Sequence, residues 1–227
     1  MCGRFALTQT DEQTLVETFS LSGAVPELAP RYNIAPTQTV ATVVRDPESG
    51  EYRLEMMRWG LIPSWSKDPS VASKMINARG ETVHEKPSFR TALRKRRCLI
   101  VADGFYEWQE KGSGPKQPMF ITLEDRRPFG MAGLFEFWTE PQSGETLRTC
   151  TIVTTAANEL MLQFHHRMPV IVPREEYAAW LNPDYADPVQ IMPMIRPYPA
   201  DEMTYYPVSR RVNTVGNDDP SLIERAV

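Results

Sequence analysis

The second residue of the chain carries its most distinctive chemistry. Cys2 follows Met1 directly, so removal of the initiator methionine would leave an α-amine and a thiol on adjacent carbons. When unperturbed, the amine titrates near pH ~8 and the thiol near ~8.5, so both are partly nucleophilic at neutral pH. Such a 1,2-aminothiol can act as a thiolate with its own amine as base. It can also condense with an aldehyde, because the amine forms a Schiff base and the thiol then closes a five-membered thiazolidine ring.

A glutamate surrounded by aromatic residues is the second candidate for chemistry. Glu107 lies in the stretch Phe105-Tyr106-Glu107-Trp108, which reads as a strand. The period of two places Phe105 and Glu107 on one face of that strand. If this face is buried, desolvation raises the pKa of Glu107 and suits it to acid and base work near neutrality. If the strand lies at a sheet edge, Glu107 is in water; the sequence leaves both readings open.

Composition narrows the function classes. The net charge of −4 argues against a protein that coats nucleic acid non-specifically, although a local basic groove is compatible with it. Three widely spaced cysteines predict no disulfide framework and a reducing cytoplasm. The three histidines have no metal-ligand spacing, so we expect no metal and no cofactor. No apolar run is long enough for a membrane span, and no secretory signal opens the chain.

Short strands dominate the predicted elements. A cap at Thr10 or Asp11 predicts a helix to Phe19. The 20 prolines and irregular loops favour an α+β fold, a single domain over residues 1–227. We expect a bent antiparallel sheet or open β-barrel-like core with a few flanking helices. Further strands are predicted at 39–44, 52–59, 98–102, 105–108, 119–123, 130–135 and 148–155, a hairpin loop at 111–116, and helices at 88–97, 156–164 and 173–181.

Two local features have a structural interpretation that is favoured over a functional one. Trp65 lies in a Gly/Pro loop, where a place in the core is favoured over an aromatic platform for a nucleobase. The basic run from Arg94 to Arg97 ends a predicted helix, and cations at a helix C-terminus favour a solvated face.

Six dense stretches, far apart in sequence, carry a resemblance to a known family. In order they are MCGRF, RYNIAP, INARGET, DGFYEW, HHRMPVIV and VSRRVN. Together, with cysteine at position 2, they resemble the SRAP family (SOS response-associated peptidase) from residue 2 to about 215. The resemblance implies a sensor of abasic sites in single-stranded DNA. Family members form a covalent thiazolidine crosslink between the N-terminal cysteine and the C1′ aldehyde of the opened sugar, which shields the lesion during the DNA damage response.

The resemblance also implies the reacting residues. Cys2 matches the reactive cysteine, and Asn77 the asparagine that positions the N-terminus and the opened sugar. Glu107 matches the glutamate that moves protons, and His165 the histidine that polarises or protonates the sugar oxygen. His166 stands where the family usually has an acidic or amide residue.

A DNA-binding surface is implied in the same way. Trp65 matches the wedge residue, and Pro36 lies near the reacting sugar. The implied partner is single-stranded DNA with an abasic site, bound by a monomer in the cytoplasm or, on DNA, with the bacterial nucleoid. The implied phosphate contacts are Arg4, Arg79, Arg167, Ser209 and Arg210.

Two other functions remain as alternatives. N-terminal-nucleophile glutamine amidotransferases also begin Met-Cys-Gly, but this chain continues Arg4-Phe5 and has no Asn-Gly-Asp element. A non-covalent binding module for single-stranded nucleic acid would need the aromatic and basic residues but not Cys2. The peptidase in the family name points to autoproteolytic removal of Met1, which a methionine aminopeptidase could also perform.

Overall fold

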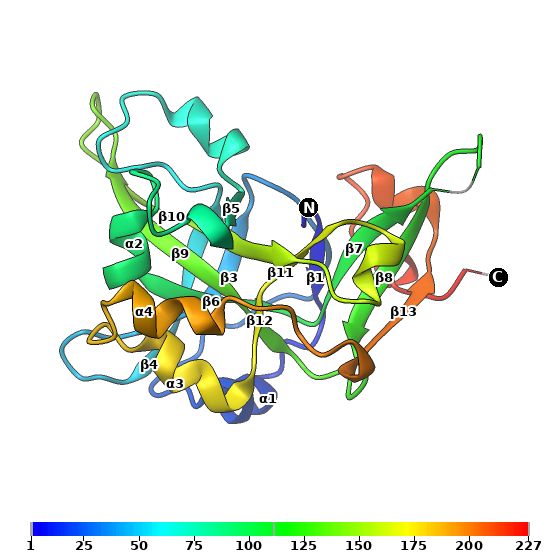
Figure 1. The fold of residues 1–227 in the computed structure, drawn as a ribbon, viewed down its shortest axis with the longest axis horizontal. Helices are drawn as coiled ribbons and strands as arrows, with labels where there is room; N and C mark the ends of the chain where they lie inside the picture. Colours follow the sequence, from blue (N-terminus) through cyan, green and yellow to red (C-terminus); the bar gives the residue numbers. More distant parts are fainter. Residues whose placement is uncertain (1, 111, 227) are drawn as a thin grey trace.

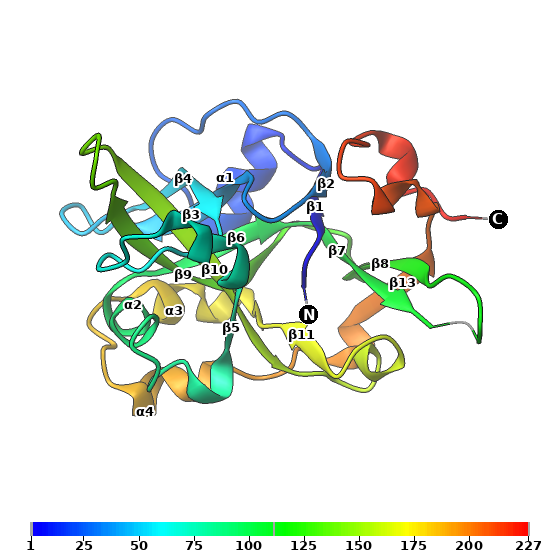
Figure 2. The same ribbon diagram turned by 90° about the horizontal axis from the view of Figure 1, so that it is seen from above.

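Two β-sheets make up most of the molecule (Figures 1 and 2). The computed structural model describes residues 2–110 and 112–226. Met1, Lys111 and Val227 lie outside this range, and with them the predicted removal of Met1 and the first residue of the predicted loop at 111–116. Few and short helices accompany the sheets, so the predicted α+β class is confirmed.

The larger sheet closes into a five-stranded barrel. Its strands pair in the order β4, β3, β6, β9, β10, and all of these neighbours are antiparallel. The ring closes because β10 also pairs in parallel with β4, with Cys150 beside Trp59. The predicted open barrel is therefore closed. The strands are β3 (Thr39–Arg45), β4 (Tyr52–Trp59), β6 (Arg97–Ala102), β9 (Phe129–Thr139) and β10 (Thr146–Ala156).

The smaller sheet carries the start of the chain. Its order is β13, β8, β7, β1, β2, so β7 is an interior strand with β8 and β1 on its two sides. Gly104 opens β7, where a side chain would meet the Phe120 ring at 2.0 Å. The strands are β1 (Phe5–Leu7), β2 (Arg31–Ile34), β7 (Gly104–Gln109), β8 (Gln117–Leu123) and β13 (Met203–Pro207).

Short strands extend the barrel near the end of β10. β5 (Asn77–Arg79) runs parallel to β10, and β11 (Arg167–Pro169) pairs with it antiparallel. Thr154 of β10 lies opposite Arg79 of β5 and opposite Pro169 of β11. β12 (Ile171–Val172) pairs with β9. This arrangement brings the segments around Asn77 and His165 to the two sides of one strand.

Three of the four predicted helices form, and two of these are shorter than predicted. Asp11 caps α1 (Glu12–Phe19), as predicted. The predicted helix at 156–164 is wrong, because only a 3-10 turn forms at Met161–Gln163. There the Asn158 amide oxygen accepts from the Met161 N–H at 2.9 Å, which favours a turn over a continuous helix. The remaining helices are α2 (Arg90–Lys95), α3 (Tyr177–Leu181) and α4 (Pro188–Ile191).

One tryptophan joins the two sheets. Trp59, at the end of β4, packs edge-on against Phe5 of β1 with ring centroids 5.1 Å apart. Its indole N–H donates to the Ile76 carbonyl at 2.9 Å, one residue before β5. Both aromatic rings are fully buried. Trp59 thus fixes the strand that follows Cys2 beside the strand that begins with Asn77.

Candidate active site

Cys2 lies buried at the beginning of the smaller sheet. Its side chain has 0% exposure, and its segment is held to β7 by the Tyr106 N–H, which donates to the Arg4 carbonyl at 3.0 Å. Burial raises the pKa of the Cys2 thiol to about 12, and the negative charge of Glu107 acts in the same direction. The thiol pKa of an unperturbed cysteine therefore does not apply to Cys2, and sulfur chemistry here needs a proton acceptor.

Glu107 is buried, which decides between its two readings. Its exposure is 5%, because β7 is covered by a strand on each side. Phe105 belongs to the main core and Tyr106 to a separate cluster, as the predicted alternation of faces requires. Burial raises the pKa of the Glu107 carboxyl. A carboxyl of this kind, close enough to shift the Cys2 thiol, is suited to exchange protons with it.

Asn77 contacts the backbone of the nucleophile. Its side-chain N–H donates to the Cys2 carbonyl at 2.8 Å. The amide oxygen of Asn77 is buried, and no atom of the described residues hydrogen-bonds to it. The contact positions the start of the chain, and the oxygen can accept from an amine or a hydroxyl brought next to Cys2.

His165 presents one defined nitrogen. Its Nδ1 accepts the Arg167 backbone N–H at 2.9 Å, so the proton of the neutral ring is on Nε2. Burial lowers the pKa of His165, and the His166 ring stacks on it with centroids 4.3 Å apart. Burial thus favours the neutral ring, whose Nε2–H is available as a hydrogen-bond donor. The Arg167 backbone N–H thus orients the His165 ring.

The start of the chain lies between the two halves of the site. In both ribbon views the N-terminal end lies beside β5 and β11, the strands next to Asn77 and His165 (Figures 1 and 2). A hydrogen bond joins Asn77 to Cys2, and the charge of Glu107 acts on the Cys2 thiol. Cys2 precedes β1, Asn77 begins β5, Glu107 lies on β7 and His165 lies in the segment before β11. Cys2, Asn77 and Glu107 are thus brought together, and β10 places the segment of His165 on the other side of the strand that borders β5.

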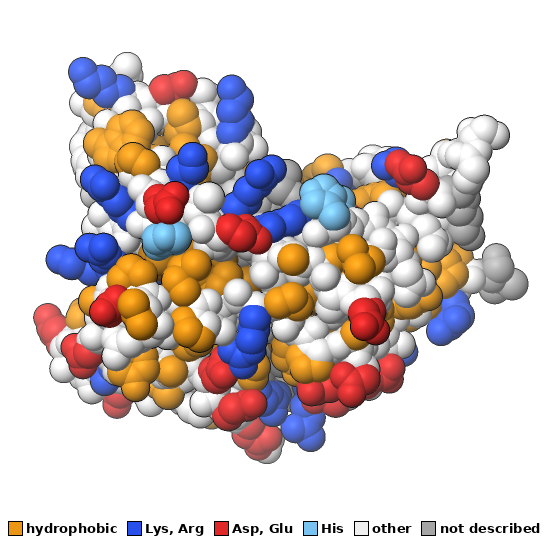
Figure 3. Space-filling model, viewed as in Figure 1, with side chains coloured by type: hydrophobic (Ala, Val, Ile, Leu, Met, Phe, Trp, Pro, Cys, Tyr) orange, Lys and Arg blue, Asp and Glu red, His pale blue; other side chains and the backbone are white. Residues whose placement is uncertain are grey.

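The predicted DNA-binding residues fall into two groups. Trp65 is 67% exposed, so its place in the core is wrong; Arg79 and Arg210 are exposed as well. Pro36 and Ser209 are half-buried. Figure 3 shows a hollow between two lobes, with Lys and Arg side chains along it.

Arg4 and Arg167 are committed to internal contacts. Arg4 donates through Nη1 to the Asn33 amide oxygen at 2.6 Å and to the Val212 carbonyl at 2.7 Å. It thereby fixes the turn at Arg210–Asn213, where the Ser209 hydroxyl accepts the Arg211 N–H at 3.3 Å. Arg167 forms an ion pair with Glu81, and its side chain is only 12% exposed.

Sequence reasoning missed two residues of this region. Trp59 and Glu81 act through their neighbours, and neither belongs to a pattern that marks it. Glu81 does fall inside the INARGET stretch, which is the one available signal. Its role becomes visible only when β10 brings β11 beside β5.

Other features of the described chain bear on the function classes. Cys2, Cys98 and Cys150 are free thiols. Across residues 2–110 and 112–226, no group of three His, Cys, Asp or Glu side chains could hold a metal ion. In the same part of the chain, none of the helices has the length and apolar character to cross a membrane.

Comparisons with known proteins agree with one another. A family model described as SOS response associated peptidase (SRAP) matches residues 1–215. "Abasic site processing protein YoqW" of Bacillus subtilis (strain 168) is 46% identical over 226 residues, which cover 99% of each chain. "Abasic site processing protein HMCES" of Gallus gallus is 39% identical and matches 86% of this chain and 66% of that one.

Solved structures support the fold. A protein from Bacteroides thetaiotaomicron superposes with a TM-score of 0.88 at 27% identity, and the match covers all of both chains. A protein from Bordetella bronchiseptica gives a TM-score of 0.76 at 30% identity over 92% of this chain and 100% of that one.

Proposed function

Because the chain belongs to the SOS response associated peptidase (SRAP) family, we propose that it processes abasic sites in single-stranded DNA. After removal of Met1, Cys2 forms a thiazolidine crosslink with the lesion. The observation that carries the proposal is the fully buried Cys2, held by Asn77 and close to the buried carboxyl of Glu107. The relatives are named abasic site processing proteins, which supports the same substrate. The protein then acts in the DNA damage response, in the cytoplasm and on the nucleoid.

The first steps join nitrogen to carbon. The abasic sugar opens when the O4′–C1′ bond breaks, the 1′-hydroxyl loses its proton and O4′ gains one. The Nε2–H of His165 suits it to stabilise the negative charge that develops on a sugar oxygen, and Glu107 to carry the protons. The Cys2 amine then adds to the C1′ aldehyde, and loss of one water leaves a Schiff base.

The last step joins sulfur to carbon. The Cys2 sulfur bonds to C1′, the carbon–nitrogen double bond becomes single, and the thiol proton ends on nitrogen. Because the thiol of Cys2 has a raised pKa, this proton needs a carrier, and Glu107 is the buried group placed to provide it. The overall change is the loss of one water from protein plus DNA. Asn77 holds the cysteine in position through its carbonyl.

Binding precedes this chemistry and is assigned to the hollow of Figure 3. The exposed Trp65 offers a flat face for a base, and Arg79 and Arg210 offer charge to phosphates. Pro36 and Ser209 lie at its border in this proposal, and Arg4 supports it from beneath. Contacts to phosphates and to base faces carry little sequence information, which suits a damage sensor. Autoproteolysis or an aminopeptidase would expose Cys2.

Intact-protein mass spectrometry tests the proposal. The purified protein should lack Met1, and incubation with a single-stranded oligonucleotide that carries one abasic site should add the mass of that oligonucleotide less one water. The adduct should persist without borohydride, and Cys2→Ala should give none. If Met1 is absent and no adduct forms, the aldehyde chemistry is wrong. Labelling of Cys2 by an irreversible glutamine analogue would then favour the amidotransferase alternative.

A further inference from the structure

Glu81 holds the guanidinium of Arg167 in a two-pronged contact. The Nη1 of Arg167 donates to one carboxylate oxygen at 2.5 Å, and Nη2 donates to the other at 3.0 Å. The same Nη2 donates to the carbonyl and hydroxyl oxygens of Thr154, at 2.7 and 3.1 Å. A phosphate group presents two oxygens to an arginine in the same way as a carboxylate does. Glu81 therefore occupies the position on Arg167 that a DNA phosphate would take.

The two partners differ in exposure. The Arg167 side chain is 12% exposed and the Glu81 side chain 53%. The arginine is fixed from beneath by Thr154, whereas the glutamate reaches it from the solvent side. Solvent reaches the half-exposed Glu81 carboxylate and screens its charge, although both of its oxygens contact the guanidinium. A phosphate that approaches from solvent can consequently displace the Glu81 carboxylate, while the Arg167 guanidinium keeps its hydrogen bonds to Thr154.

Glu81 is also the counter-charge of a second arginine. The hydrogen bond from Arg167 lowers the pKa of Glu81, and the charge of Arg79 lowers it further. Glu81 is thus ionised at neutral pH. It lies two residues after Arg79, so one carboxylate offsets both arginines next to the site.

We infer that Glu81 is a specificity-determining residue, an internal phosphate mimic that lowers the affinity for undamaged strands. Any strand must displace its carboxylate before a phosphate can bind Arg167. At an abasic site the covalent step offsets the weak reversible binding of DNA. An intact strand offers no aldehyde and dissociates. The inference rests on the proposed function, since it needs DNA in the hollow.

The test measures reversible binding alone. Fluorescence anisotropy with an undamaged single-stranded oligonucleotide, over a series of salt concentrations, excludes the covalent step. Glu81→Gln should lower Kd by roughly 3–10-fold and steepen the dependence of log K on log salt by up to about 0.7, the contribution of one phosphate contact on a single strand. Glu81→Asp, whose shorter side chain cannot span both nitrogens, should give an intermediate gain. Arg167→Ala in the Glu81→Gln background should remove the gain.

Glu85→Gln is the matched control, because it removes the same charge from an exposed residue four positions away. It should leave Kd within about 2-fold. An equal gain from Glu85→Gln would overturn the inference in favour of a general charge effect, and an unchanged or weaker Kd for Glu81→Gln would overturn it as well. If wild type binds no single-stranded DNA even at low salt, the proposed function itself fails. Tighter binding by wild type than by Glu81→Gln defeats only the role of Glu81.

Discussion

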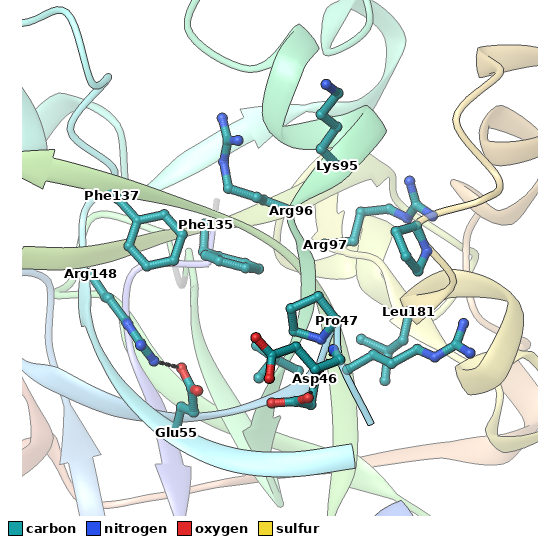
Figure 4. A pocket seen from close by; sticks show the side chains of 14 residues that line it. Asp46, Pro47, Glu55, Lys95, Arg96, Arg97, Phe135, Phe137, Arg148 and Leu181 are labelled. Atoms are coloured by element: carbon teal, nitrogen blue, oxygen red, sulfur yellow. Dashed lines mark hydrogen bonds and ion pairs between the residues drawn. The ribbon is translucent and has the colours of Figure 1, made fainter. Parts of the chain in front are cut away.

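Two hollows of the molecule differ in how their charged groups are placed. A cavity of about 450 Å³ lies between the β3–β4 turn, the start of β10 and the end of α2. Arg148 faces Glu55 across it, and both side chains are partly exposed, as Figure 4 shows for their ion pair. Arg148 also lies 5.4 Å from the ring centre of Phe137, and Arg96 pairs with Glu136 at 2.7 Å. The cavity has volume and charge, and the ion pair of Arg148 with Glu55 is partly exposed to solvent.

The Cys2 site has the opposite character. Cys2 is fully buried and Glu107 is 5% exposed, and burial raises the pKa of both groups. Titratable groups that a fold holds out of water, next to one another, are typical of sites that move protons. The two regions thus differ in exposure: the carboxyl and the thiol of the Cys2 site are held out of water next to each other, which supports the roles proposed for them.

Glu107→Gln should give the largest effect on rate. An amide cannot exchange protons, so the rate of crosslinking should fall by about 10²–10⁴-fold. Because burial raises the pKa of Glu107, the wild-type rate should rise with pH above the ordinary carboxyl range near ~4.3, and the variant should lack that rise. Single-turnover crosslinking on denaturing gels, followed over pH, measures both. Glu55→Gln, in the cavity, is the matched control and should leave rate and profile unchanged.

The same substitution should act on stability with the opposite sign. A carboxyl whose folded pKa exceeds its unfolded pKa loses stability as pH rises through that window, because the folded state binds the extra proton. Glu107→Gln should therefore unfold at a higher temperature than wild type at neutral pH, and the difference should disappear at acidic pH. A lower melting temperature at neutral pH would show that the carboxylate stabilises the fold.

His165 should give the next effect. His165→Ala should slow crosslinking by about 10–100-fold, and His165→Gln should recover part of the rate by supplying a side-chain N–H. Because burial lowers its pKa, the ring should stay neutral until pH falls below ~6.5. Protonation would then place a second hydrogen opposite the Arg167 N–H. An NMR titration of the ring checks this, and a midpoint above the ordinary value would contradict the neutral-donor role.

Local patterns predicted the local parts of the fold. The hairpin of β3 and β4 and the start of α1 follow from β-branched residues and an Asp11 cap. Barrel closure had no local signal, since the parallel pairing of β4 with β10 joins residues about 90 positions apart. The solvated end predicted for 94–97 is wrong at Arg97, which begins β6, is 5% exposed and donates to the Leu93 carbonyl at 2.5 Å.

The sequence indicated candidate site residues, but it did not indicate how burial shifts their pKa values. Family motifs led to Cys2, Asn77, Glu107 and His165, whose assigned roles stay predictions. The burial of Glu107 depends on β1 and β8, which cover β7. The raised thiol pKa follows from the burial of Cys2 and from the charge of Glu107. A sequence pattern shows neither the burial of Glu107 nor the raised pKa of Cys2, because both depend on strands that meet only in the fold.

Arg79→Ala should weaken reversible binding modestly. Arg79 is exposed at the end of β5, and loss of one phosphate contact should make the salt dependence shallower by about 0.7. Anisotropy with undamaged single-stranded DNA measures it. Arg53→Ala is the control, because it removes an equal charge from the β3–β4 hairpin, where Arg53 pairs with Asp46 at 3.0 Å. Equal changes in the two variants would place Arg79 away from the phosphates.

Arg148→Ala should give the smallest effect and completes the comparison of the two hollows. Its ion pair with Glu55 is partly exposed, with side chains 45% and 28% accessible, so its loss should lower the free energy of unfolding by about 0.2–1 kcal/mol. The contact with the Phe137 ring adds a similar small amount at an exposed site. Denaturant unfolding measures the stability, and the crosslinking rate should equal that of wild type. A large loss of crosslinking in Arg148→Ala would mean that the cavity takes part in the function, because Arg148 would then interact with DNA and not only with Glu55.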